Sequence, residues 1–250
     1  MMYFLLRPFR VAGLITAFCL ASFIPASASE SWKDQGAATP NWAGLYIAGS
    51  VGYGFGTGKD TVELSGFPTT RDNVDIDGFT GTVAIGYDHM VSSNLLVGVF
   101  ADYAFGKLDG SGERFYPLGS PAEPFDVSID NMWSVGARLG LVTSRDSLLY
   151  VTAGYTQADL RYSDQFDTGH WDLKGYFLGA GFEKMLRAGW FMRAEYRFSD
   201  YGKETIFEDT PGCAPSCLER ERLDTKMHAL RLGIVYKLGG ESVMAQEAYK

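Results

Sequence analysis

The chain has 250 residues, of which 46% are hydrophobic and 14% aromatic, and its formal net charge is −8 at pH 7. This length fits a single domain, and the negative charge argues against a nucleic-acid partner. After the first thirty positions the chain lacks any run of about eighteen apolar residues. That excludes a membrane-spanning helix there, but not membrane-spanning strands, which need only about ten alternating residues each.

The N-terminal segment, residues 1–28, is predicted to be a secretory signal peptide. Arg7 and Arg10 precede a short apolar run, and Ala26-Ser27-Ala28 matches a small-residue cleavage site. Cleavage there would remove two arginines and no acid, leaving 20 basic and 30 acidic residues and a net charge of −10. The polar residues 29–40 are expected to form a short periplasmic leader.

Beyond residue 40, eight segments carry apolar residues at every second position, which is the period of a β-strand. In each segment one face is uncharged through its middle, whereas the other mixes small residues with charged ones. The connections alternate between a few residues and long polar stretches. The predicted strands are 42–55, 79–90, 95–106, 132–142, 148–156, 175–185, 190–199 and 228–238, with short turns at 92–94, 143–147 and 186–189.

Short turns alternating with long loops are typical of bacterial outer-membrane barrels, in which the short turns face the periplasm. The sequence therefore predicts an all-β fold, an eight-stranded antiparallel up-and-down transmembrane β-barrel over residues 41–238. It would have short periplasmic turns, long extracellular loops and a short periplasmic tail at 239–250.

The position of the charges distinguishes this barrel from a soluble sandwich or a lipocalin, which strand alternation alone would also fit. A soluble barrel turns its apolar face inward and its polar face to water. Here small residues separate the charges, as the narrow interior of an eight-stranded barrel requires, and buried charges persist only when paired. We therefore expect a luminal ion-pair network of Asp88, Asp102, Arg138, Glu183, Arg193, Glu195, Arg197, Arg231 and Lys237.

Aromatic residues lie near the ends of the uncharged faces, where the interfaces of a membrane barrel carry aromatic girdles. The uncharged faces would then contact the acyl chains of the membrane. The predicted girdle residues are Tyr53, Phe55, Phe79, Tyr87, Tyr103, Phe105, Trp133, Tyr176, Trp190 and Tyr236.

Several segments together resemble the OmpA-like outer-membrane β-barrel (porin) family of alphaproteobacteria. The resemblance covers about residues 41–238 and departs from the family at Phe100, where an acid is frequent, and at the last strand, which a tail follows in place of a terminal aromatic. It implies a place in the outer membrane of a Gram-negative bacterium, contact with lipid and lipopolysaccharide, and insertion by the barrel-assembly machinery. The matching segments are Asn41-Trp42-Ala43-Gly44-Leu45-Tyr46-Ile47-Ala48-Gly49, Gly98-Val99-Phe100-Ala101-Asp102-Tyr103, Arg138-Leu139-Gly140-Leu141, Gly179-Ala180-Gly181-Phe182-Glu183 and Arg193-Ala194-Glu195-Tyr196-Arg197.

The few residues that could carry chemistry are scattered along the chain. His89, His170 and His228 are not at metal-ligand spacing. Cys213 and Cys217 are expected to form a disulfide after export to an oxidising compartment. No catalytic residue, metal or cofactor is predicted.

Three functions remain open at this point. The first is a structural envelope protein with at most narrow, porin-like diffusion. The second is a surface binding module whose acidic loops, 56–77, 107–130 and 201–226, engage an unknown ligand. The third is a lipid A-modifying enzyme, which would need Ser199, His228 and an acid such as Asp224 to converge. We expect Ser199 and His228 on opposite faces, which disfavours the enzyme.

Overall fold

The computed structural model describes residues 41–64, 70–114, 123–163, 168–209 and 219–238. The predicted signal peptide, leader, C-terminal tail and Cys213–Cys217 disulfide lie outside these residues. No helix within them is long and apolar enough to cross a membrane. The strands are β1 (Gly44–Leu64), β2 (Thr70–Met90), β3 (Leu95–Gly106), β4 (Leu108–Arg114), β5 (Glu123–Ser144), β6 (Ser147–Ser163), β7 (Thr168–Arg187), β8 (Trp190–Asp209) and β9 (Glu219–Lys237).

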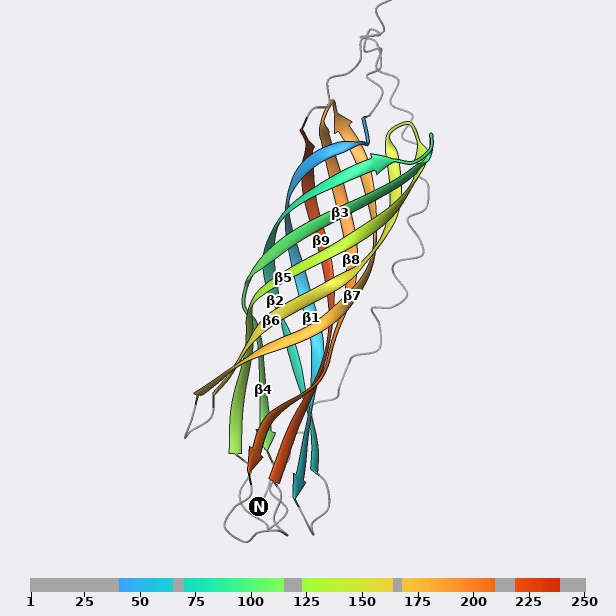
Figure 1. Ribbon diagram of the computed structural model, residues 1–250. Coiled ribbons are helices and arrows are strands. Elements are labelled where there is room, and N and C mark those ends of the chain that lie inside the picture. The colour runs from blue at the N-terminus through green and yellow to red at the C-terminus, as the bar shows by residue number, and fades with distance from the viewer. Residues whose placement is uncertain (1–40, 65–69, 115–122, 164–167, 210–218, 239–250) are drawn as a thin grey trace, which may run out of the picture. The chain divides into compact units, whose positions relative to one another are not determined.

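The strands form one antiparallel sheet that closes on itself (Figure 1). Its order is β1-β9-β8-β7-β6-β5-β3-β2, and β2 pairs back with β1. On β1, for example, Ile47 lies opposite Ile85 of β2 and Tyr236 of β9. The predicted up-and-down ring of about eight strands is thus confirmed.

The structure contains one strand more than predicted. This additional strand, β4, follows β3 and, like β3, lies between β2 and β5. Leu108 of β4 pairs with Ile129 of β5, and Asp109 pairs with Asp77 of β2. Between β3 and β4 the backbone of Gly106 has a φ of 142°, a conformation that side-chain-bearing residues rarely adopt. The prediction of a loop at this point was wrong, because the strand resumes as β4 after the kink at Gly106.

The short turns were predicted correctly. The turn between β5 and β6 contains only residues 145 and 146, and that between β7 and β8 only residues 188 and 189. Asp146 accepts hydrogen bonds from the hydroxyls of Ser144 at 2.8 Å and Ser147 at 3.0 Å. These hydrogen bonds hold the pKa of the Asp146 carboxyl below its usual range. We call this end of the barrel the short-turn end.

At the opposite end the strands run far beyond their predicted limits. Val62 still pairs with Thr70, well past the paired aromatic residues Tyr53 and Phe79. Most of the stretches predicted as long loops, 56–77, 107–130 and 201–226, are therefore strand. His170 likewise lies on a strand, β7, opposite Arg161 of β6. We call this extension the distal segment.

The side-chain pattern inverts in the distal segment, which explains the error. Val74 and Ile76 of β2 are buried, whereas Asp75 and Asp77, which alternate with them, are exposed. This inward apolar and outward polar pattern is that of a sheet surrounded by water. The resulting distal core consists of Val74, Ile76, Leu108, Phe125, Val127, Ile129, Ala158, Leu160, Tyr162, Leu173, Tyr201, Leu223 and Met227.

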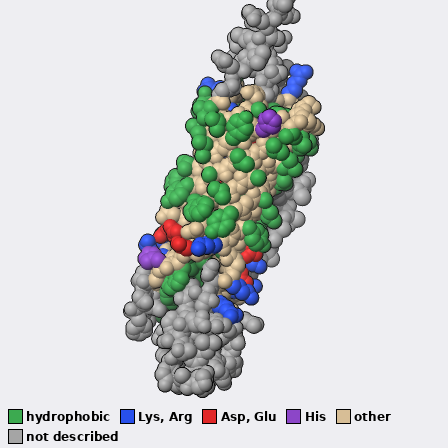
Figure 2. Space-filling model, viewed as in Figure 1, with side chains coloured by type: hydrophobic (Ala, Val, Ile, Leu, Met, Phe, Trp, Pro, Cys, Tyr) green, Lys and Arg blue, Asp and Glu red, His purple; other side chains and the backbone are tan. Residues whose placement is uncertain are grey.

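Between the distal segment and the short-turn end, the apolar side chains face outward. Val99 is 61% exposed and Leu232 63% exposed. Figure 2 shows the hydrophobic side chains along the barrel, with charged side chains beyond the ends of the hydrophobic surface. An exposed apolar area of this extent is what a protein surrounded by lipid presents.

Candidate functional site

The lumen at membrane level contains two groups of ion pairs, and all nine predicted network residues lie in it. Asp88 and Glu183 are completely buried, and Asp102, Arg138, Glu195, Arg197 and Lys237 are buried as well. The side chains of Arg193 and Arg231 are 12% and 10% exposed.

The first group, nearer the short-turn end, is organised around Arg138 of β5. Its Nε donates to Asp88 Oδ1 at 2.7 Å, and its Nη1 donates to Glu183 Oε1 at 2.6 Å. Glu183 also accepts from Arg193 Nε at 2.8 Å. Lys237 Nζ donates to Asp88 Oδ2 at 2.5 Å. Two carboxylates thus hold three cations.

The second group lies farther from the short-turn end. Arg197 Nη2 donates to Asp102 Oδ2 at 2.7 Å and to Glu195 Oε1 at 3.0 Å. Arg231 is a looser member, with Nη1 at 3.8 Å from both carboxylates. Glu195 also accepts from the hydroxyl of Tyr150 at 2.9 Å.

Luminal aromatic rings, which the sequence analysis did not identify as site residues, flank the cations. The Arg138 guanidinium lies 4.8 Å from the ring centre of Tyr46 and 5.2 Å from that of Tyr150, within the range of cation–π attraction. Each ring lies against a glycine on the neighbouring strand, Tyr46 against Gly86 and Tyr150 against Gly181. A glycine paired with an aromatic residue on the neighbouring strand is the signal that could have identified Tyr46 and Tyr150, but it can be recognised only when the strand register is known.

Apolar residues close the lumen on both sides of the ion pairs. The distal core lies on one side. On the short-turn side is a second buried cluster of Trp42, Tyr46, Leu96, Leu148, Tyr150, Phe191 and Val235. Two luminal cavities between these clusters each have a volume of about 20 Å³, which is space for about one water molecule.

All ten predicted girdle residues lie on the outer surface, and some form ring pairs. The ring centres of Trp190 and Tyr236 are 4.8 Å apart near the short-turn end. At the opposite interface those of Tyr53 and Phe79 are 5.0 Å apart, and the Tyr53 hydroxyl donates to Asp77 at 2.5 Å. This hydrogen bond marks the level at which the outer surface changes from apolar to charged.

His228, which was not assigned to the girdle, belongs to the same surface. Its ring stacks on Phe55 with centres 5.3 Å apart, and its Nδ1 lies 2.7 Å from the Tyr196 hydroxyl. Ser199, in contrast, is buried in the lumen. These two side chains therefore do not form the catalytic arrangement considered above. Within the described residues, no three His, Cys, Asp or Glu side chains are grouped to hold a metal.

Comparisons with known proteins agree with this architecture. Residues 16–237 match the family model described as outer membrane protein beta-barrel domain. The 31 kDa outer-membrane immunogenic proteins of Brucella melitensis and Brucella suis are each 24% identical over 247 residues, covering 91% of this chain and 96% of the relative. The solved structure of outer membrane protein OprG from Pseudomonas aeruginosa is 14% identical, with a TM-score of 0.53, and covers 80% of this chain and 98% of that chain.

Proposed function

The chain belongs to the family of outer membrane protein β-barrel domains, and on this basis we propose that it is a structural protein of the Gram-negative outer membrane. In this role it contributes to envelope integrity and admits at most narrow, porin-like diffusion. The observation that carries the proposal is the filled lumen, in which the ion pairs lie between two apolar clusters.

The energetics of the lumen support a closed barrel. Opening a path would require Arg138 to leave both Asp88 and Glu183, which are completely buried. Leaving one charge of a buried ion pair without its partner costs about 3–5 kcal/mol. The rings of Tyr46 and Tyr150 would also have to move away from the guanidinium. A wide aqueous pore is therefore not expected.

Conductance across a planar lipid bilayer tests this proposal. The purified, refolded protein should produce no large conductance steps under conditions in which a sixteen-stranded porin conducts. A Tyr46→Ala, Tyr150→Ala variant, which removes two luminal rings, serves as a widened control. Porin-sized steps from the wild-type protein would contradict the proposal.

The outer surface supports an additional contact with lipopolysaccharide. Four exposed lysines lie on strands that are consecutive in the ring, beyond the girdle residues Phe55 and Tyr176. Among the described residues, Asp172, Asp200 and Asp224 are interspersed among them, so four lysines face three acids and the sector has a small positive balance, as suits a surface that meets the phosphates of a glycolipid. The lysines are Lys59 on β1, Lys226 on β9, Lys203 on β8 and Lys174 on β7.

Binding to lipopolysaccharide micelles tests this contact. Replacing the four lysines by glutamine should weaken the binding in a salt-dependent manner. A control in which Lys184 and Arg187, near the short-turn end, are replaced by glutamine should bind as the wild type does. Equal binding by both variants would exclude the lysine sector.

A surface-binding role is the second candidate, and the length of the strands favours it. The β1–β2 ladder continues from Tyr53–Phe79 to Val62–Thr70, so the paired strands themselves extend well beyond the aromatic girdle. Shortening the connections 65–69, 115–122, 164–167 and 210–218 to glycine–serine linkers should preserve folding. If cells carrying these variants adhere to host cells or matrix as wild-type cells do, the binding role is excluded.

A further inference from the structure

The charges in the membrane-level lumen do not balance. Among the described residues, four acids and five bases face inward there. If all are ionised, the lumen carries one positive charge that no side chain compensates. An uncompensated charge in a dry interior is costly, and buried charges are normally paired.

Arg231 is the least well paired of the five cations. Its Nη1 is 3.8 Å from Asp102 and Glu195, and both of these carboxylates already accept shorter hydrogen bonds from Arg197. Its Nε has no hydrogen-bond partner among the described residues, although the side chain is only 10% exposed. The surplus charge and an unused donor thus occur on the same residue.

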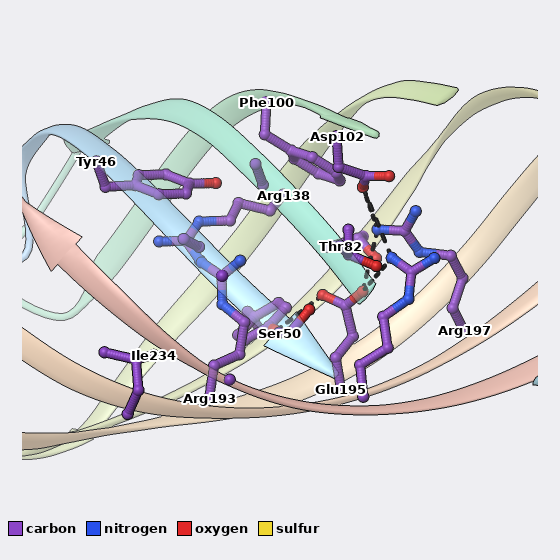
Figure 3. A pocket seen from close by; sticks show the side chains of 17 residues that line it. Tyr46, Ser50, Thr82, Phe100, Asp102, Arg138, Arg193, Glu195, Arg197 and Ile234 are labelled. Carbon is purple, nitrogen blue, oxygen red and sulfur yellow. Dashed lines mark hydrogen bonds and ion pairs between the residues drawn. The ribbon is translucent and has the colours of Figure 1, made fainter. Parts of the chain in front are cut away.

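A luminal cavity of about 20 Å³ lies where these groups meet (Figure 3). Within the part of the chain that the structure describes, four groups that line it and can donate a hydrogen bond have no partner: the Nε atoms of Arg197 and Arg231 and the hydroxyls of Thr82 and Thr152. Asp102 Oδ1 is an unpartnered acceptor in the same wall. The ionised side chains that line the cavity are Asp102, Glu195, Arg138, Arg193, Arg197 and Arg231.

We propose that this cavity binds one small monovalent anion of the halide class. Arg138 and Arg193 are already paired with Asp88 and Glu183, so the surplus around the cavity is the single positive charge of the lumen, which we assign to its least well paired cation, Arg231, and a cation is disfavoured. The unpartnered N–H and hydroxyl groups supply the donors that a halide needs, and the volume admits one water-sized species. The anion compensates the surplus luminal charge. The inference does not depend on whether the barrel conducts.

Phe100 provides a charge-based test, because it lines the same cavity. The Arg197 guanidinium lies 5.7 Å from the centre of its ring. A carboxylate at position 100 would compensate the surplus charge from within the wall. Arg231→Met removes the surplus cation, whereas Phe100→Glu adds the missing anion, so either change should make the halide unnecessary.

The first experiment locates the ion directly. The wild-type protein is crystallised from sodium bromide, and diffraction data are collected at the bromine absorption edge. An anomalous peak within hydrogen-bond distance of Arg231 Nε is expected. Density at this place without anomalous signal would identify a water molecule and overturn the proposal, as would an empty cavity.

The second experiment compares variants at matched ionic strength in sodium bromide and in sodium gluconate, whose anion is too large for the cavity. The midpoint of thermal unfolding of the wild type should be higher in bromide by about 5 °C. Arg231→Met and Phe100→Glu should lose this difference, whereas Lys226→Met, at an exposed cation of the same strand, should retain it. An equal difference in all four proteins would assign the effect to the surface and contradict the proposal. If neither luminal variant folds, the bromide peak decides.

Discussion

Arg138 and Glu183 are joined across the lumen by a hydrogen bond of 2.6 Å, although their strands, β5 and β7, are not neighbours in the ring. Glu183 simultaneously accepts from Arg193 of β8. The carboxylate therefore connects three strands from inside, in addition to the backbone hydrogen bonds around the ring.

Replacing Glu183 by glutamine should be strongly destabilising. The change leaves Arg138 and Arg193 buried without their shared carboxylate, which we expect to lower the free energy of unfolding by about 3–5 kcal/mol. Urea unfolding in lipid vesicles measures the loss. Asp159→Asn, at an exposed position, is the control and should change little. A loss below about 1 kcal/mol for Glu183→Gln would show that the network does not stabilise the barrel.

Placing an arginine at Val99 tests which face meets lipid. Val99 is exposed at the middle of the apolar surface, so Val99→Arg should cost about 2–4 kcal/mol in a bilayer. Asn73→Arg, on an outward position of the distal segment, should cost much less. Equal costs for the two variants would refute the membrane boundary drawn here.

The distal core should behave as the core of a soluble domain. Leu160 is buried in it, so Leu160→Ala should cost about 2–5 kcal/mol through the lost contacts and the cavity that remains. Its neighbour Asp159 points outward, and Asp159→Ala should have little effect. Hydrogen exchange of the distal amides would show whether the loss is local. Similar small effects from both changes would contradict an ordered distal core.

Gly86 provides the space for the Tyr46 ring. A methyl group at position 86 would collide with that ring, so Gly86→Ala should destabilise by about 1–3 kcal/mol. Combining it with Tyr46→Ala should cost less than the sum of the two single changes, because the collision is then removed. Strict additivity in this double-mutant cycle would exclude the steric explanation.

The β5–β6 turn should respond to acid. The pKa of Asp146 is lower in the folded protein than in the unfolded chain, because Ser144 and Ser147 donate hydrogen bonds to the carboxylate. Its contribution is therefore present above the unfolded pKa and is lost as the pH falls through the folded pKa. NMR titration should show the depressed pKa, and Ser144→Ala should raise it towards the ordinary value. An unchanged pKa in that variant would contradict the assigned cause.

The period-two pattern of the sequence was sufficient to predict the ring, its short turns and the outward face. Gly98 and Asp102 share one face of their strand and Val99 lies on the other, because a strand turns alternate side chains to opposite sides. Once the charged face is assigned to the lumen, Val99 must face outward. The same pattern assigned the nine charged residues to the lumen. Their orientation follows from local alternation, which the sequence contains directly.

Which charges pair, and where the membrane surface ends, depended on the tertiary structure. Arg138 reaches Glu183 only because the closed ring brings non-adjacent strands face to face, and this distance depends on the register of every strand between them. The distal segment was missed because the surrounding medium changes from lipid to water along a single strand. The alternation then continues while its direction relative to the core reverses, and only the folded ring shows at which residue this occurs.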